Sequence, residues 1–159
     1  MIDAHLDLAS MAVEGRTLTR CVPDAAMGCI SLPDLRDGAI TVCGATIFTA
    51  PGGDMNRLGY SSSDDRQGAF DAGMVQLQIY EELEAAGHVR IIRTTDDMDD
   101  LGQRIGLVLL MEGGDPIRSP DDVEFWFQRG LRWVGMTWSR GTRYAGGNAA
   151  PGPLTDALR

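Results

Sequence analysis

The fold is decided by Arg104-Ile105-Gly106-Leu107-Val108-Leu109-Leu110-Met111-Glu112-Gly113-Gly114. The apolar residues of this stretch form a nearly continuous run that ends on a carboxylate and two glycines. A run of this length is typical of a strand buried on both faces, as in a parallel α/β sheet. The glycines allow a sharp turn and a close approach by another group. The sequence therefore predicts a central parallel strand with Glu112 at its carboxyl end.

Glu112 is the first candidate functional residue. A carboxylate at the end of a buried strand is costly to desolvate, so it needs water, a cation or a metal. Functional side chains of parallel barrels lie where the strands end at their carboxyl face. For this segment alone, the alternative is that Glu112 is simply solvated at the end of the strand.

The amino terminus supplies a second candidate pair. Residues 1–8 read MIDAHLDL, in which apolar and polar residues alternate with the period of a strand. His5 and Asp7 are two positions apart, so both side chains leave the same face of such a strand. An imidazole and a carboxylate on one face form half of a metal site, because zinc accepts both ligand types. A structural hydrogen bond between the two residues is the alternative.

The rest of the chain alternates between helical and strand patterns. The expected elements are short helices over 8–14 and 31–38, a strand over 39–48, a long helix over 65–86, a short strand over 89–93, an acidic helix through Leu101, a helix after Ser119 that ends at Gly130, a strand over 131–138 and the beginning of a helix at 154–159. This alternation predicts parallel βα units, wound right-handed, in a single domain over 1–159.

Composition limits the class of protein and its partners. The 159 residues, 43% hydrophobic and 23% charged, suit one globular domain. They fall short of the roughly 200 residues that a closed (β/α)8 barrel needs. The net charge is -9, and all 14 basic residues are arginine. This balance repels phosphate backbones and anionic lipids, so nucleic acid and membrane surfaces are not expected as partners.

The cysteines and the hydropathy pattern bear on location. Cys21, Cys29 and Cys43 are odd in number and lack a CxxC spacing, which favours free thiols in a reducing compartment. No apolar stretch approaches the roughly 20 residues of a membrane span. The amino terminus is acidic, where a secretory signal is basic. The chain as given is therefore expected in the cytoplasm.

Four segments together resemble the membrane (renal) dipeptidase family, which comprises zinc-dependent peptidases of the amidohydrolase type. They are IDAHLD at 2–7, LPDLRDGAI at 32–40, LLMEGGDPI at 109–117 and GLRWVGMTWSRGTRYAGGNAAPGPLTD at 130–156. The segments occur in the family's order and spacing. EGGDPI followed by GLRWVGMTW is a specific signal, whereas H-x-D alone is weak.

The resemblance implies a TIM-barrel-like (β/α)8 fold, of which this chain is expected to form about the first half. It also implies a site for two zinc ions. His5 and Asp7 match the pair that ligates one zinc, and Glu112 matches the catalytic carboxylate that bridges both. In the family, the two metals activate a hydroxide and polarise the carbonyl of a dipeptide or related amide. The implied function is a zinc-dependent dipeptidase-like hydrolase, inactive as this chain alone.

Two departures from the family's pattern limit these expectations. The family's second zinc uses two histidines of later strands, and no histidine follows Glu112 here. Trp138 stands at the position where a histidine often touches substrate. An indole can stack on substrate but cannot play the same acid or electrophile role. Trp138 is therefore a candidate for substrate binding.

Two other functions stay open. The first is a non-catalytic half-barrel that binds or assembles, with a homodimer or another partner covering its open sheet edges. A symmetric dimer would repeat the same ligands and would not restore the missing histidines. The second is another hydrolase of the amidohydrolase superfamily. This is the weaker alternative, because such relatives usually begin with an H-x-H pair where this chain has His5 and Asp7.

Overall fold

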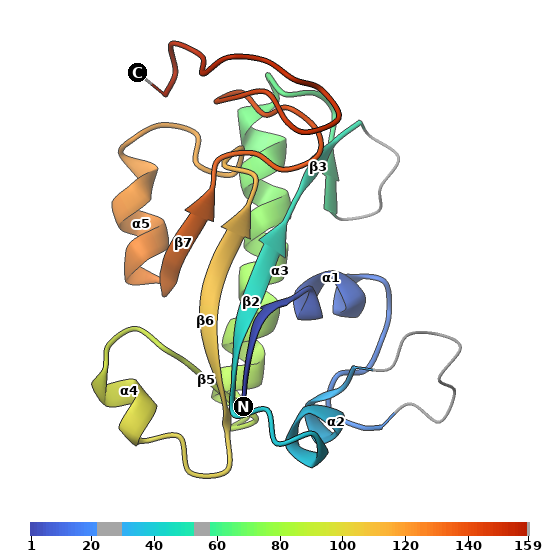
Figure 1. The fold of residues 1–159 in the computed structure, drawn as a ribbon, viewed down its shortest axis with the longest axis vertical. Helices are drawn as coiled ribbons and strands as arrows, with labels where there is room; N and C mark the ends of the chain where they lie inside the picture. The colour runs from blue at the N-terminus through green and yellow to red at the C-terminus, as the bar shows by residue number, and fades with distance from the viewer. Residues whose placement is uncertain (22–29, 53–57, 159) are drawn as a thin grey trace.

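The computed structural model describes residues 1–21, 30–52 and 58–158, and at least one helix stands between successive strands of its main sheet (Figure 1). In chain order the elements are β1 (Ile2–Leu6), α1 (Leu8–Val13), α2 (Leu32–Asp37), β2 (Val42–Phe48), β3 (Ala50–Pro51), β4 (Gly59–Tyr60), α3 (Arg66–Ala85), β5 (Val89–Ile91), α4 (Asp96–Asp99), β6 (Ile105–Glu112), α5 (Asp122–Gln128) and β7 (Leu131–Gly135).

The main sheet has five strands, and each of its ladders is parallel. Its order is β1–β2–β6–β5, and β7 also pairs with β6. β5 pairs with the beginning of β6, where Val89 lies opposite Ile105, and β7 pairs with its end, where Gly135 lies opposite Glu112. The carboxyl ends of β2, β6 and β7 therefore point to the same edge of the sheet (Figure 1). The expected parallel α/β architecture is confirmed.

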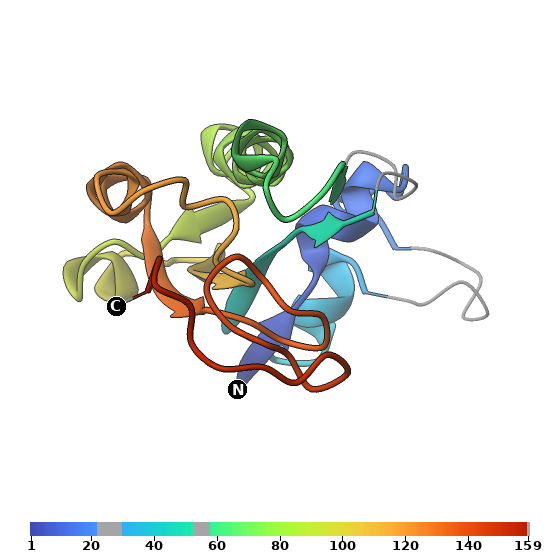
Figure 2. The same cartoon turned by 90° about the horizontal axis from the view of Figure 1, so that it is seen from above.

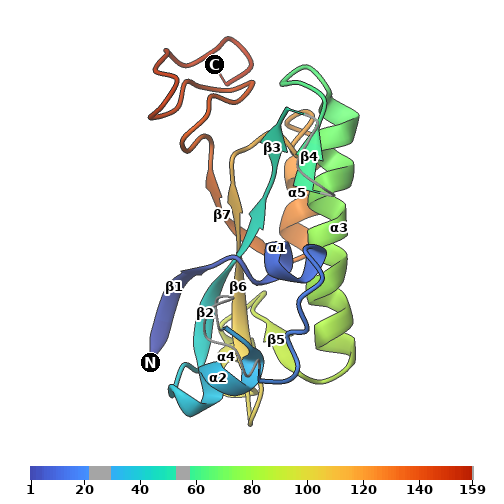
Figure 3. The same cartoon turned by 90° about the vertical axis from the view of Figure 1, so that its right-hand side faces the viewer.

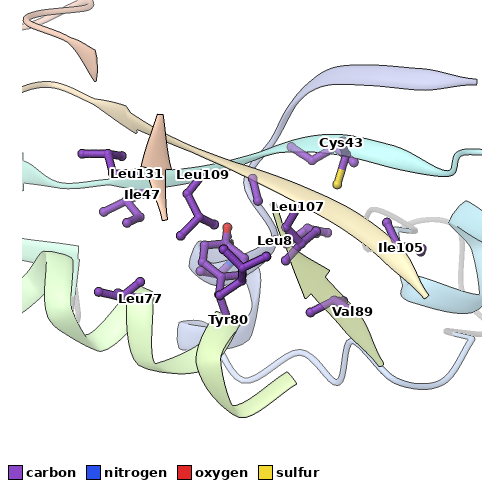
Figure 4. Close-up of a cluster of buried hydrophobic side chains, with 14 of the residues drawn as sticks. Leu8, Cys43, Ile47, Leu77, Tyr80, Val89, Ile105, Leu107, Leu109 and Leu131 are labelled. Atoms are coloured by element: carbon purple, nitrogen blue, oxygen red, sulfur yellow. Dashed lines mark hydrogen bonds between the residues drawn. The ribbon is translucent and has the colours of Figure 1, made fainter. Parts of the chain in front are cut away.

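The core lies between the sheet and α3, which runs along one face (Figure 3). Leu77 and Tyr80 of α3 are fully buried and point toward sheet residues such as Leu109 (Figure 4). The Tyr80 hydroxyl donates to the Thr46 carbonyl at 2.7 Å and accepts from the Ala9 N–H at 3.1 Å. This one side chain therefore ties α3 to β2 and to α1, the helix that follows the first strand.

Some element ends differ from the sequence-based expectation. The second strand begins at Val42, because a turn precedes it in which Ala39 has a φ of +56°. The strand expected over 131–138 ends at Gly135, and the residues after it turn away over the sheet's carboxyl edge (Figure 2). The helix expected from Leu154 is wrong. Leu154 instead forms an antiparallel bridge with Ala145, which folds this segment back on the preceding loop.

The described part of the sheet is open at both edges. Within residues 1–21, 30–52 and 58–158, β1 pairs only with β2, and β7 pairs only with β6. Large apolar side chains are exposed along β7, including Trp133 at 56% and Val134 at 38%. Such an edge presents unpaired backbone groups to any further strand.

Cysteine placement agrees with free thiols where it is described. Cys21 is exposed and Cys43 is buried, and both are free, whereas Cys29 lies outside the described residues. Burial raises the pKa of the Cys43 thiol to about 12, and the charge of Asp3 adds to this effect, so the thiol stays protonated. None of the described helices has the length and apolar character needed to cross a bilayer. The cytoplasmic location stays a prediction.

Candidate metal centre

Three side chains meet at the carboxyl edge of the sheet. His5 lies in β1, Asp7 directly precedes α1, and Glu112 is the last residue of β6. The His5 Nε2 atom is 3.0 Å from Glu112 Oε2 and 3.6 Å from Asp7 Oδ1. One ligand atom from each residue lies within 4.8 Å of the other two. The structure therefore brings together the three residues that the sequence singled out as metal ligands.

Gly44 of β2 allows this meeting. β2 lies between β1 and β6, so His5 has to reach Glu112 across it. A Cβ atom on Gly44 would lie 2.3 Å from the Ala4 carbonyl oxygen and 2.9 Å from Leu110 Cδ2. A side chain at this position would therefore push away the strand that carries His5.

The two glycines after Glu112 have separate roles. Gly113 has a φ of +88°, a conformation that favours glycine, and its N–H donates to the Gly135 carbonyl at 2.8 Å. A Cβ on Gly114 would lie 3.0 Å from the ring of Tyr144. The first glycine therefore makes the turn, and the second allows the close approach of the loop after β7.

The electrostatics of the cluster favour a cation. The Glu112 side chain is 13% exposed, whereas those of His5 and Asp7 are about half exposed. Burial raises the pKa of the Glu112 carboxyl above its usual value; a protonated His5 opposes this rise, and the negative charge of Asp7 adds to it. Two carboxylates in contact with one imidazole leave the cluster short of positive charge, which a bound cation would supply.

The donor set fits zinc. Zinc takes imidazole nitrogen and carboxylate oxygen at about 2.0–2.2 Å, so adjacent ligand atoms of a tetrahedral site lie roughly 3.3 Å apart. The 3.0 and 3.6 Å separations from His5 Nε2 bracket this value. The chemistry of His5, Asp7 and Glu112 and their spacing therefore suit such an ion.

A cavity of about 190 Å³ adjoins Glu112. Trp138 forms one wall, with its ring edge-on to Phe48 at a centroid distance of 6.1 Å and an interplanar angle of 87°. Trp138 lies in the loop after β7 and is 57% exposed. Arg140, from the same loop, also lines the cavity. Trp138 and Glu112 therefore line the same cavity, and the substrate-binding role of Trp138 stays a prediction.

A buried network fixes the loops around this cavity. The Asp115 carboxylate accepts from the Tyr60 hydroxyl and, at 2.8 Å, from the Arg143 N–H. The Arg143 guanidinium donates to the carbonyls of Asp115 at 2.6 Å and Ile117 at 3.0 Å. Burial raises the pKa of the Tyr60 phenol, and its bond to Asp115 raises it further, so Tyr60 remains a donor. The network joins the segment after β6 to the segment after β7.

Sequence reasoning gave no role to several of these residues. Tyr60 and Arg140 stand in long loops rich in glycine and proline, with no motif that marks them. Asp115 is part of EGGDPI, but its position after two glycines does not reveal that it is buried. In the sequence, these residues are marked only by following the segments that form β2, β6 and β7. Their meeting around one cavity is seen only in the structure.

Comparison with known proteins agrees with this geometry. The profile of the membrane dipeptidase family, peptidase family M19, matches residues 1–155. The chain belongs to this family. No curated protein matches the sequence. The resemblance carried by the H-x-D and EGGDPI segments is thus confirmed.

Solved structures share the fold of this chain. A dipeptidase described as a metallopeptidase of family M19 is 18% identical, with a TM-score of 0.72 over 98% of this chain and 50% of its own. A metallopeptidase from Rhodobacter sphaeroides, bound to a phosphinate mimic of the dipeptide L-Ala-D-Ala, is 19% identical, with a TM-score of 0.71 over 98% of this chain and 52% of its own. The probable dipeptidase PvdM from Pseudomonas aeruginosa is 16% identical, with a TM-score of 0.69 over 91% and 36%. The chain thus spans about half the length, or less, of these structures.

Proposed function

We propose that this chain supplies the first half of a zinc-dependent dipeptidase. In this proposal His5 and Asp7 ligate one zinc ion, and Glu112 bridges it to a second. The observation that carries the proposal is the contact of His5 with Asp7 and Glu112 at the carboxyl edge of a parallel sheet, in a chain of the M19 family. Catalytic groups of parallel barrels occupy this edge.

The chain's own residues have defined parts in the proposed reaction. Zinc bound at the cluster would supply Lewis acidity, which polarises the amide carbonyl and lowers the pKa of a water molecule. β1 and β6 position His5 and Glu112, and Asp7 follows β1 directly, so the three ligand atoms lie close together before binding. The aromatic wall formed by Phe48 and Trp138 offers an apolar surface for substrate in the cavity that Glu112 also lines.

The proposed substrate is a dipeptide or a related amide. The dipeptide mimic bound to the Rhodobacter sphaeroides relative supports this choice. We further propose that activity needs the other half of a barrel. Two observations support this: the described sheet is open at β1 and β7, and the solved relatives are about twice as long. The described cluster also contains a single histidine, and a second zinc requires more ligands than it offers.

The test uses the two histidines of the chain as a matched pair. His5→Ala should lower zinc affinity at least 100-fold and abolish dipeptide hydrolysis by the complete protein. His88→Ala is the control, because the His88 N–H donates to the Leu83 carbonyl and its carbonyl accepts from the Arg36 guanidinium, and both are backbone groups that the substitution keeps. Zinc affinity is measured by competition with a chelating dye, and hydrolysis by release of free amino acid. Equal zinc affinity in wild type and His5→Ala would refute the assignment.

A second candidate function is an assembly module, supported by an apolar groove beside the free edge. The groove, of about 400 Å³, lies between α5 and β7, with Phe127 and Val134 among its exposed side chains. Analytical ultracentrifugation of the chain tests this role. Under the assembly hypothesis, Val134→Glu dissociates a specific oligomer while leaving the helical circular dichroism unchanged. A wild-type chain that is monomeric at tens of micromolar would count against it.

A further inference from the structure

Arg140 stands out in the cavity beside Glu112. It is the one cationic residue among the described residues that line this cavity, and it is exposed. Its Nη1 donates to the Pro51 carbonyl at 3.1 Å. Within the described residues no carboxylate forms an ion pair with it, and its side-chain hydrogen bond is the one to Pro51. A guanidinium has five N–H groups, so Arg140 retains donors for a ligand.

The backbone that carries Arg140 is held in place. The Trp138 and Ser139 carbonyls accept from the N–H groups of Asn148 and Ala149 at 2.9 and 2.8 Å. The Thr137 hydroxyl donates to the Arg140 carbonyl at 2.9 Å. The guanidinium lies next to Gly52, where an added Cβ would be 3.6 Å from Nη1. Arg140 is thus fixed both by its own loop and by the loop after β3.

The walls of the cavity define what fits inside. Trp138 and Phe48 are aromatic, Pro51 and Ala50 are apolar, and Arg140 supplies the positive charge. At about 190 Å³ the cavity is smaller than the roughly 300–1,000 Å³ of sites that enclose drug-sized ligands, so it suits one amino-acid residue. A planar guanidinium recognises carboxylates through two parallel hydrogen bonds.

We propose that this cavity is a carboxylate subsite and that Arg140 binds the carboxylate of the substrate residue that enters it. The inference rests on the proposed dipeptidase function and adds a specificity-determining residue to it. The protein carries a net charge of -9, so a cation in the wall of this cavity favours the entry of an anionic group there. Arg140 provides this cation on the side of Glu112 that the cavity occupies.

The carboxylate has two sources in a dipeptide, the acidic side chain and the terminal carboxylate. Kinetics of the complete metal-loaded protein with Ala-Asp, Ala-Asn and Ala-alaninamide separate them. Arg140→Gln should lower kcat/KM about 10- to 100-fold through KM, the range of one charged hydrogen-bonded contact. A loss confined to Ala-Asp assigns the side chain, and an equal loss for Ala-Asp and Ala-Asn, but not Ala-alaninamide, assigns the terminal carboxylate.

Two further variants make the test specific. Arg140→Lys should recover part of the lost kcat/KM, because lysine keeps the positive charge but cannot make the two parallel hydrogen bonds of a guanidinium. Arg104→Gln makes the same charge change at the amino end of β6, where Arg104 pairs with Asp100 at 3.1 Å, and should leave all three substrates unaffected. An Arg140→Gln protein that keeps every kcat/KM within threefold, or loses all three equally, would overturn the proposal.

A binding measurement separates this proposal from the proposed function. Calorimetric titration of Ala-Asp into the metal-free protein reports on Arg140 without catalysis. If the wild type hydrolyses none of the substrates but binds Ala-Asp at least 10-fold more tightly than Arg140→Gln does, the dipeptidase assignment fails and the carboxylate subsite stands. If the wild type hydrolyses the substrates and the two proteins bind and turn them over equally, the subsite alone fails.

Discussion

Gly44→Ala tests how the sheet assembles the metal centre. The added Cβ would meet the Ala4 carbonyl oxygen at 2.3 Å, and real Cβ contacts essentially never fall below 3.0 Å. The Ala4 carbonyl oxygen and the new Cβ therefore have to separate by at least 0.7 Å, and Leu110 Cδ2 also crowds this Cβ at 2.9 Å. Overpacking of this kind costs about 1–3 kcal/mol of unfolding free energy. His5 follows Ala4 directly, so the movement reaches the ligand.

The expected functional effect is a 10- to 100-fold weaker affinity for zinc, as found when groups that support metal ligands are altered. Chelator competition measures the affinity, and urea unfolding measures the stability. Gly135→Ala is the matched control, because a Cβ on this strand glycine would lie 3.7 Å from its nearest neighbour, the Met111 carbonyl oxygen. Wild-type zinc affinity in Gly44→Ala would show that the close packing of β1 on β2 does not position His5.

Three further predictions concern stability. Tyr80→Phe should cost about 1–3 kcal/mol, because it leaves the buried Ala9 N–H and Thr46 carbonyl without their hydroxyl partner; urea unfolding measures this, and no change would contradict it. Burial alone would raise the pKa of Asp97, but hydrogen bonds from backbone N–H groups and an arginine hold it below its usual value. Its contribution to stability is therefore present above pH 3.8 and is lost as the pH falls through the lower folded pKa, so Asp97→Asn should flatten unfolding free energy against pH in this acid range. Zinc at 100 times its Kd should raise the unfolding free energy by about 2.7 kcal/mol, and a chelator should remove this gain; calorimetric scans with and without metal check it.

Much of the fold could be predicted because its elements carry local signals. The run that ends at Glu112 is buried as a central strand, and the apolar spacing of Leu77 and Tyr80 places one face of α3 in the core. The end of β7 was harder to place, because the residues after Gly135 remain as apolar as the strand itself. Whether Leu154 begins a helix depends on its bridge to Ala145, a contact that no local pattern reveals.

The candidate metal centre was predictable in its residues but not in its surroundings. His5 and Asp7 lie at the carboxyl end of β1 and Glu112 ends β6, two strands away in one parallel sheet, and this placement follows from the strand pattern together with the family resemblance. The cavity beside them is built by segments after β2, β6 and β7 that pack through tertiary contacts, such as the bond of Arg140 to Pro51. Loop conformations of this kind depend on the whole sheet rather than on nearby residues.

The separation of the ligands along the chain has a consequence for folding order. His5 and Asp7 are neighbours, whereas Glu112 joins them only after a loop of about 100 residues has closed, at an entropic cost on the order of 4 kcal/mol. A newly made chain therefore offers a metal two ligands at first and acquires the third when β2 and β6 have aligned. Full metal affinity therefore appears late in folding, after the central strands have paired. The time course of metal uptake during refolding would measure when this pairing occurs.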